Sequence, residues 1–235
     1  MTRPNIFVTG SSRGIGAAIV ARLSDRAALI GHGTSAAADR LAADLAEAGA
    51  APKLWAAALE RLGGRIDILV NNAGVFESAP LDGEDAEWLA AWERTLRINL
   101  TAAAELSRLA VRHFIAHGGG RIVNIASRAA YRGDSPAHWH YAAAKGGMVA
   151  MTKTIARGYA AEGVLAFAIC PGFTMTGMAD DYLASRGGDR LLQDIPLGRV
   201  ADPAEVAEVV RFCCFDAPPS MTGAVLDING ASYVR

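Results

Sequence analysis

The chain has 235 residues, a hydrophobic content of 51% and 25 glycines, which suits one compact α/β domain with a sizeable core. A net charge of −1 gives no electrostatic basis for binding nucleic acid or an anionic membrane surface. No apolar run approaches the roughly 18 residues of a membrane span, and Cys170, Cys213 and Cys214 lack metal-ligand spacing. We therefore expect a cytoplasmic protein with buried thiols.

The first predicted strand, residues 5–9, runs directly into a glycine-rich turn. Gly10, Gly14 and Gly16 have the spacing Gly-x-x-x-Gly-x-Gly, and an apolar-periodic helix follows to about Ser24. Glycines let the backbone turn tightly and approach a pyrophosphate, which then binds at the helix N-terminus. Such a turn can also be a plain corner between a strand and a helix, but its place on the first strand favours a dinucleotide site.

The end of the second predicted strand, residues 27–31, bears on the choice of nicotinamide cofactor. An acidic side chain there would bond to the adenosine ribose 2′-hydroxyl and repel a 2′-phosphate. The chain has His32 instead, with no carboxylate before Asp39, and the planar guanidinium of Arg13 could bind the phosphate. We expect NADP(H) to be preferred and NAD(H) to be possible. The alternative is that Arg13 merely points into solvent.

The stretch from Gly33 to Ile66 is shorter than two helices and an intervening strand usually need. We expect helices over residues 35–48 and 52–62, with the edge strand between them shortened or absent.

A buried strand is predicted over residues 67–70, followed by two carboxamides and two small residues at 71–74. This composition suits a turn that lines a cofactor crevice, although such turns are common elsewhere. A long helical pattern then runs from Ala86 to about His117. It contains Asn99, a poor helix former that needs a structural reason in this position.

Tyr141 and Lys145 are the most informative pair, because residues four apart share one face of a helix. A cation about 4 Å from the phenol, at an effective dielectric near 20, favours the phenolate by roughly 4 kcal/mol, or about three pKa units. We therefore predict a Tyr141 pKa of about 7, suited to proton transfer. Only three of the 23 basic residues are lysines, and lysine can release a proton where arginine cannot. Ser127 lies at the tip of the preceding predicted strand, residues 121–126.

The last third of the chain is predicted to hold strands over 164–169 and 225–228, with a helix from Pro203 to about residue 215. Residues 174–195 mix small, polar and apolar side chains and are predicted to form a substrate lid. His138 and His140 have no partner at ligand spacing, so we expect no metal.

Taken in order, these motifs resemble those of the short-chain dehydrogenase/reductase family over about residues 5–230. They are the glycine turn, Asn71-Asn72-Ala73-Gly74, Asn99, Ser127, Tyr141-x-x-x-Lys145 and Pro171-Gly172. The resemblance implies one doubly wound Rossmann domain spanning residues 1–235. Its parallel sheet would have six or seven strands, with helices on both faces.

The resemblance also implies roles for particular residues. Tyr141 would be the general acid in reduction or the base in oxidation, and Lys145 would lower its pKa and hold the nicotinamide ribose. Ser127 would bond to the substrate oxygen, and Asn99 would hold a water that links Lys145 to solvent. The cofactor-binding residues implied are Gly10, Ser12, Arg13, Gly14, Ile15, Gly16, His32, Asn72, Ala73, Gly74, Tyr141, Lys145, Pro171, Gly172, Thr174 and Thr176.

Two features depart from the family pattern. Members usually carry an Asp followed by an aliphatic residue after the third strand, where the pair contacts adenine, and we do not find that pair. The nearest-looking branch is the 3-oxoacyl thioester reductases. Where members acting on acyl carrier protein have basic residues, this chain has Gly118 and Glu162, and Glu162 would not attract an acidic carrier.

The leading hypothesis is an NADP(H)-dependent oxidoreductase that interconverts a small ketone and a secondary alcohol. One alternative is a 3-oxoacyl-[acyl-carrier-protein or CoA] reductase. Another is a dinucleotide-sensing protein without turnover. The resemblance implies a homotetramer or homodimer assembled through the long helices and the last strand, and the apolar segments 213–215 and 225–228 are consistent with this.

Overall fold

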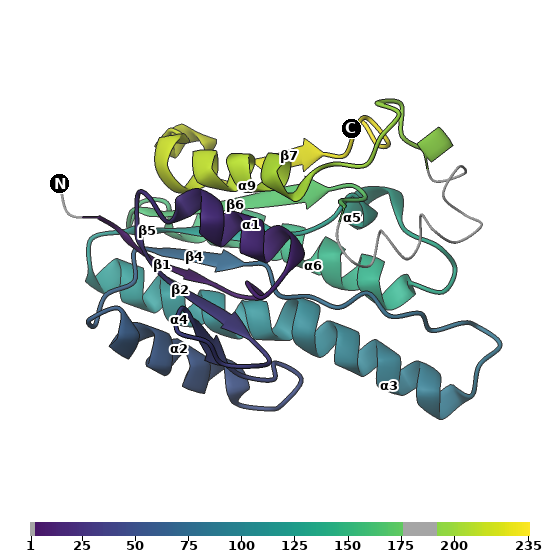
Figure 1. Ribbon diagram of the computed structural model, residues 1–235, viewed down its shortest axis with the longest axis horizontal. Helices are drawn as coiled ribbons and strands as arrows, with labels where there is room; N and C mark the ends of the chain where they lie inside the picture. The colour runs from purple at the N-terminus through teal and green to yellow at the C-terminus, as the bar shows by residue number, and fades with distance from the viewer. Residues whose placement is uncertain (1–2, 176–191) are drawn as a thin grey trace.

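A parallel seven-stranded sheet forms the centre of the protein, whose computed structural model describes residues 3–175 and 192–235 (Figure 1). The strand order is β3-β2-β1-β4-β5-β6-β7, and every neighbouring pair is parallel. The order reverses between β1 and β4, which is where doubly wound sheets bind their ligands. The strands are β1 Asn5–Val8, β2 Ala28–Gly33, β3 Arg40–Ala42, β4 Ile68–Asn71, β5 Gly120–Ile125, β6 Val164–Pro171 and β7 Val225–Ile228.

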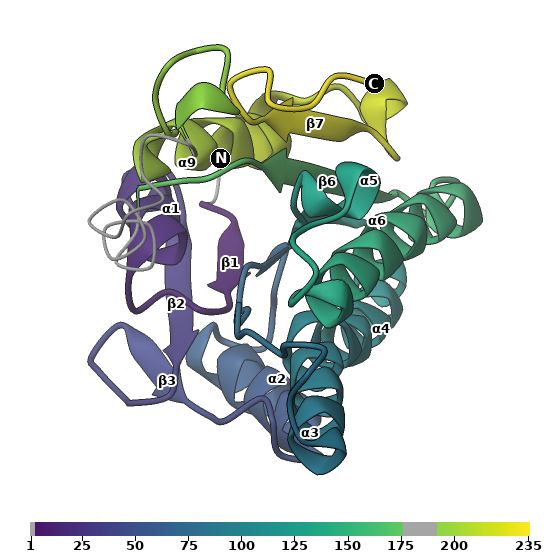
Figure 2. The ribbon, with the colours of Figure 1, turned by 90° about the vertical axis from the view of Figure 1, so that its right-hand side faces the viewer.

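Helices cover both faces of the sheet, as predicted. Figures 1 and 2 show α1 and α9 on one face and α2, α4 and α6 on the other. The described helices are α1 Gly14–Leu23, α2 Ala50–Arg61, α3 Asp85–Leu96, η1 Arg97–Thr101, α4 Ala102–Ala116, α5 Ala129–Arg132, α6 Trp139–Tyr159, α9 Pro203–Arg211, η2 Phe212–Asp216 and η3 Pro219–Met221. Within these described helices, none combines the length and apolarity that a bilayer crossing requires.

Alternate residues of each strand enter two separate cores. Phe7 packs with α2 and α4, whereas its neighbours Ile6 and Val8 pack with α1 and α9. Cys213 and Cys214 lie inside the second core and are almost fully buried. Their side chains are therefore covered within the monomer, and the apolar character of this segment is explained by the core.

The edge of the sheet differs from the prediction. The helix expected over residues 35–48 is wrong: Ala37 and Arg40 exchange backbone hydrogen bonds of 3.0 and 3.1 Å in a tight turn, and β3 follows at once. The alanine-rich composition favours a helix locally, but pairing of β3 with β2 overrides it. The shortened edge strand is confirmed, since β3 has 3 residues, and α2 matches the second expected helix.

The long predicted helix runs from α3 through η1 to α4, and its middle is a π-helical turn that contains Asn99. The Asn99 side chain is 0% exposed. Its Oδ1 accepts a 2.8 Å hydrogen bond from Val75 N–H, and its Nδ2 donates a 2.8 Å bond to Val75 C=O. The unfavourable mid-helix asparagine therefore has a structural reason: it fixes the loop between β4 and α3.

We predict that Asn99→Ala lowers the free energy of unfolding by about 2–4 kcal/mol, because the Val75 N–H and C=O lose their partners. The measurement is denaturant unfolding of the protein without ligand. Thr101→Ala is the matched control, since Thr101 lies in the same π-helical turn but is exposed. Equal loss in the two variants would contradict this role.

Candidate active site

The glycine turn is fixed to the end of β4 by hydrogen bonds. Asn72 Nδ2 donates to the carbonyls of Thr9 at 3.0 Å and Gly10 at 2.8 Å, and Thr9 Oγ1 accepts 3.0 Å bonds from the N–H groups of Asn72 and Ala73. A Cβ added to Gly10, which has φ +66°, would lie 2.6 Å from Ala73 Cα. Only glycine therefore fits here, and the Asn72 side chain braces the turn.

The start of α1 is suited to a pyrophosphate. Arg13, the N-cap residue, makes no side-chain cap, and the first turn holds no acidic residue, so its N–H groups and positive dipole end remain available to an anion. Ser12 and Arg13 are exposed, and Ile15 is half-buried in the first turn. A Cβ on Gly16 would lie 2.0 Å from Gly10 O, so the helix starts in direct contact with the turn. These residues fit a dinucleotide.

His32, near the end of β2, supports the same glycine turn by a hydrogen bond. Its Nδ1 accepts a 3.2 Å hydrogen bond from Gly10 N–H, and its Nε2 lies 3.1 Å from the carbonyl oxygen of Ala43. Burial lowers the pKa of His32, which favours a neutral ring with a proton on Nε2. His32 was predicted to bind cofactor, but its two ring nitrogens are both engaged by the protein.

Two features near the end of β3 were missed in the sequence. An Asp-aliphatic pair, Asp44 and Leu45, begins two residues beyond the end of this strand, so the expectation that the family's Asp-aliphatic pair is missing is wrong. Arg40 is the second feature: its Nε donates a 3.1 Å bond to Ser35 C=O. A Cβ placed on Gly33 would lie 3.0 Å from Arg40 Cδ and 3.3 Å from Ser12 Cβ, so both side chains flank this glycine. Both features were missed because residues 35–48 were predicted to be a helix, so no strand end was expected there.

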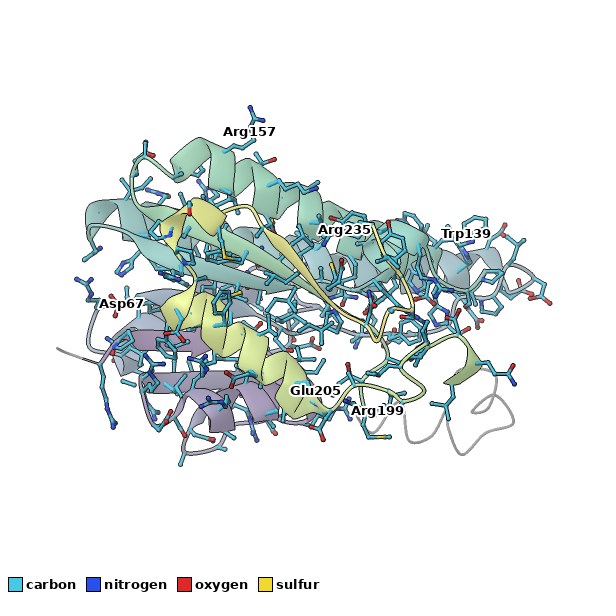
Figure 3. All side chains as sticks on the ribbon, turned by 90° about the horizontal axis from the view of Figure 1, so that it is seen from above. Asp67, Trp139, Arg157, Arg199, Glu205 and Arg235 are labelled. Carbon is cyan, nitrogen blue, oxygen red and sulfur yellow. The ribbon has the colours of Figure 1, made fainter. Side chains whose placement is uncertain are left out.

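The predicted catalytic side chains come together where β5 ends and α6 begins. Ser127 is buried just beyond β5, and its hydroxyl lies close enough to the phenol of Tyr141 to lower the pKa of that phenol. The side chain of Lys145 is only 4% exposed. Its Nζ donates a 2.8 Å hydrogen bond to Ile125 C=O and lies 5.7 Å from the centre of the Tyr141 ring. Figure 3 shows Trp139 and Arg157 near opposite ends of α6, and both catalytic side chains belong to its first half.

Asn99 lies near Lys145, and Gly74 in the turn after β4 lies against both side chains. A Cβ on Gly74 would lie 3.3 Å from Asn99 Oδ1 and 3.6 Å from Lys145 Nζ. The neighbouring Asn71 turns into the core instead, where its Nδ2 donates to Asn124 Oδ1 at 2.8 Å. Of the two carboxamides predicted to line a crevice, Asn71 is therefore structural.

The expected lowering of the Tyr141 pKa is wrong for this structure. Burial raises the pKa of Tyr141 to about 12, and the nearby Ser127 hydroxyl offsets only part of that rise. Lys145 is itself buried, which lowers its pKa to about 8. The sequence-based prediction counted only the attraction between the lysine cation and the phenolate. Loss of water disfavours both of these charged forms.

The end of β6 lies beside Ser127, since Arg128 N–H donates a 3.0 Å bond to Pro171 C=O. Gly172 N–H donates to Ile228 C=O at 2.8 Å, and Thr174 Oγ1 donates to Gly172 C=O at 3.3 Å. Thr176 and most of the predicted lid over 174–195 lie outside the described residues.

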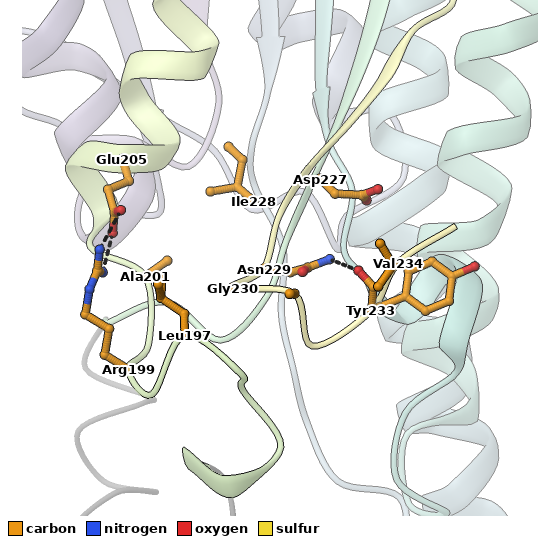
Figure 4. A pocket seen from close by; sticks show the side chains of 11 residues that line it. Leu197, Arg199, Ala201, Glu205, Asp227, Ile228, Asn229, Gly230, Tyr233 and Val234 are labelled. Carbon is orange, nitrogen blue, oxygen red and sulfur yellow. Dashed lines mark hydrogen bonds and ion pairs between the residues drawn. The ribbon is translucent and has the colours of Figure 1, made fainter.

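A separate cavity of about 310 Å³ lies between the start of α9 and the end of β7 (Figure 4). Its lining includes the ion pair of Arg199 with Glu205 and the side chains of Asn229 and Tyr233. None of the predicted catalytic residues lines it.

Comparison with known proteins now identifies the family. The profile of a family described as Enoyl-(Acyl carrier protein) reductase matches residues 10–231. The cis-4-hydroxycyclohexanecarboxylate dehydrogenase of Sinomonas cyclohexanicum is 37% identical over 95% of this chain and 94% of its own. The 3-oxoacyl-[acyl-carrier-protein] reductase FabG of Haemophilus influenzae is 34% identical over 97% of both chains.

A solved structure from Beutenbergia cavernae, assigned as an NAD(P)-dependent gluconate 5-dehydrogenase with NADP bound at low occupancy, has a TM-score of 0.89 and 30% identity. The match covers 99% of this chain and 97% of that one. The chain therefore belongs to the short-chain dehydrogenase/reductase family and is an NAD(P)-dependent oxidoreductase of that family.

We predict that Lys145→Met raises the free energy of unfolding at pH 7 by roughly 1–3 kcal/mol, because the folded protein no longer holds a buried charge. The folded-state pKa of about 8 lies below the ordinary 10.5, so the unfolded chain binds more protons between these values. The wild type therefore gains stability as the pH rises from about 8 to 10.5, and the gap closes. Chemical denaturation at several pH values measures it, with the exposed Lys153→Met as control. A difference in the free energy of unfolding between Lys145→Met and the wild type that does not change with pH would contradict a lowered pKa for Lys145.

Proposed function

We propose that this protein interconverts a ketone and a secondary alcohol with NADP(H) as cofactor. The observation that carries the proposal is the convergence of the Ser127 hydroxyl and the Tyr141 phenol, with Lys145 buried one helical turn further along α6. Two neighbouring hydroxyl groups can both point at one substrate oxygen. The phosphate-binding turn lies at the same carboxyl edge of the sheet, where doubly wound proteins bind substrate and cofactor together.

The side chains have distinct tasks in this proposal. A nicotinamide cofactor, when bound, supplies the hydride in reduction and accepts it in oxidation. Tyr141 donates its phenol proton to the carbonyl oxygen, and the Ser127 hydroxyl donates a hydrogen bond to that oxygen as negative charge develops. With a pKa raised to about 12, Tyr141 holds its proton at neutral pH, which suits the reductive direction. The Lys145 ammonium group then stabilises the phenolate that remains.

The preference for NADP(H) is supported by two arginines and by missing acidic groups. β2 ends without a carboxylate, and the first one that follows is Asp39. Arg13 is exposed and follows Ser12 in the chain, and the side chains of Arg40 and Ser12 both lie against Gly33 at the end of β2. Guanidinium groups bind phosphate in a bidentate manner, so both are proposed to bind the 2′-phosphate.

We predict that Arg13→Ala combined with Arg40→Ala lowers kcat/KM for NADPH by about 10- to 100-fold, because charged hydrogen bonds to the 2′-phosphate are lost. The value for NADH, which lacks that phosphate, falls far less. Steady-state kinetics with both cofactors measure the ratio, and the exposed Arg112→Ala on α4 is the control. An equal fall for both cofactors would rule out this role.

A second candidate function is reduction of a 3-oxoacyl thioester, which the relatives named as 3-oxoacyl-[acyl-carrier-protein] reductases favour. Glu162 is exposed between α6 and β6, so an acidic carrier protein would meet a like charge there. Acetoacetyl-CoA therefore belongs in the substrate panel as the thioester probe. A dinucleotide sensor without turnover would bind NADPH and reduce no member of the panel.

We propose assembly as a homodimer or homotetramer in the cytoplasm. β7 is an edge of the sheet and is only partly covered, so its open side can pair with another copy. The three buried free thiols suit a reducing compartment.

The test of the proposed reaction is NADPH oxidation with a panel that holds acetoacetyl-CoA, 4-oxocyclohexanecarboxylate, its carboxamide and cyclohexanone. We predict that Tyr141→Phe lowers kcat by about 10²- to 10⁴-fold, because the proton donor is lost, while NADPH still binds. Tyr159→Phe, at the far end of the same helix and 39% exposed, is the matched control. Full turnover by the Tyr141→Phe variant would show that the proposed proton donor is wrong.

A further inference from the structure

Arg128 is a buried cation next to the catalytic serine. It follows Ser127 directly and is only 8% exposed, although arginine is seldom buried unless it is paired. The bond from its N–H to Pro171 C=O fixes the start of this side chain against the end of β6. Its guanidinium carbon lies 4.8 Å from the centre of the Phe173 ring. The cation is therefore positioned by packing on two sides.

The charge of Arg128 is incompletely matched. Its Nη1 forms an ion pair of 3.3 Å with Asp194 Oδ2, but the geometry of this contact is not that of a hydrogen bond. The same carboxylate oxygen accepts a 2.7 Å hydrogen bond from Arg132 Nη1, which also donates to Ser232 C=O at 3.0 Å. One carboxylate thus serves two cations, and its hydrogen bond goes to the more exposed one.

Other charges nearby do not remove this excess. Burial lowers the pKa of Arg128, and the positive charge of Arg132 lowers it further, while Asp194 and Asp134 act in the opposite direction. Asp134 is exposed, so water screens its effect. A buried guanidinium group that shares its one carboxylate partner with a second arginine favours binding of a further anion.

We infer that Arg128 binds a carboxylate of the substrate, so that the enzyme acts on oxo acids and the corresponding hydroxy acids. This inference rests on the proposed function, which places the reacting carbonyl at Ser127 and Tyr141. The guanidinium fork matches a carboxylate in a bidentate manner. Because Arg128 is the residue next to Ser127, the carboxylate and the reacting carbonyl belong to one substrate molecule but lie several bonds apart.

The decisive comparison uses 4-oxocyclohexanecarboxylate and its neutral carboxamide, which differ in charge but hardly in shape. With NADPH, the wild type is expected to show a kcat/KM at least about 10-fold higher for the acid. Arg128→Met is expected to lower the value for the acid by about 30- to 100-fold, mainly through KM, and this loss exceeds the loss for the carboxamide by about 10-fold or more. Arg157→Met, an exposed arginine on α6, is the control.

Equal losses for the two substrates would overturn the inference, because they would show that Arg128 only anchors the segment around Asp194. A wild type that reduces cyclohexanone but has no preference for the acid would also overturn it, while the proposed function would stand. A wild type that reduces no ketone would overturn the proposed function itself.

A measurement on the wild type covers the case in which Arg128→Met does not fold. Cyclohexanecarboxylate is expected to inhibit the reduction of cyclohexanone competitively, at concentrations at least about 10-fold below those of cyclohexanecarboxamide. Equal inhibition by the acid and the amide would contradict a carboxylate site at Arg128.

Discussion

The close approach of the Ser127 hydroxyl to the Tyr141 phenol is the contact on which the proposed chemistry depends. It brings the segment just beyond a central strand to the first turn of α6, and the core beneath both is apolar. Lys145 is held in the same buried place by Ile125 C=O. Tyr141 and Lys145 are thus fixed on α6, and Ser127 follows β5 by two residues, so a rigid scaffold positions all three groups.

Loss of water sets the protonation states in this site. The same burial that keeps the proton on Tyr141 weakens the hold of Lys145 on its own proton. Near neutral pH these two pKa values leave Tyr141 protonated, as a proton donor, beside a lysine that is still mostly charged. Keeping a charged lysine buried costs stability, and such a cost is common where a site is built for chemistry.

The sequence analysis predicted the doubly wound sheet and both helical layers through the family resemblance, and its motifs named the four residues that meet near β5. It failed where long-range contacts decide. The alanine-rich stretch after Gly33 has helical composition, but pairing with β2 and the bond from His32 to Ala43 hold it extended. Residue type alone could not separate Arg128 from other possible pocket residues, since only its burial and its shared carboxylate partner set it apart.

The pKa of Tyr141 shows the same limit, since spacing reveals which groups are neighbours but not how much water they keep. The most direct test of the central claim is an experimental structure with NADP⁺ and a secondary alcohol bound. We expect the alcohol oxygen to lie about 2.6–3.2 Å from both Tyr141 Oη and Ser127 Oγ, the range for proton transfer. An alcohol oxygen bound away from either hydroxyl would contradict the account.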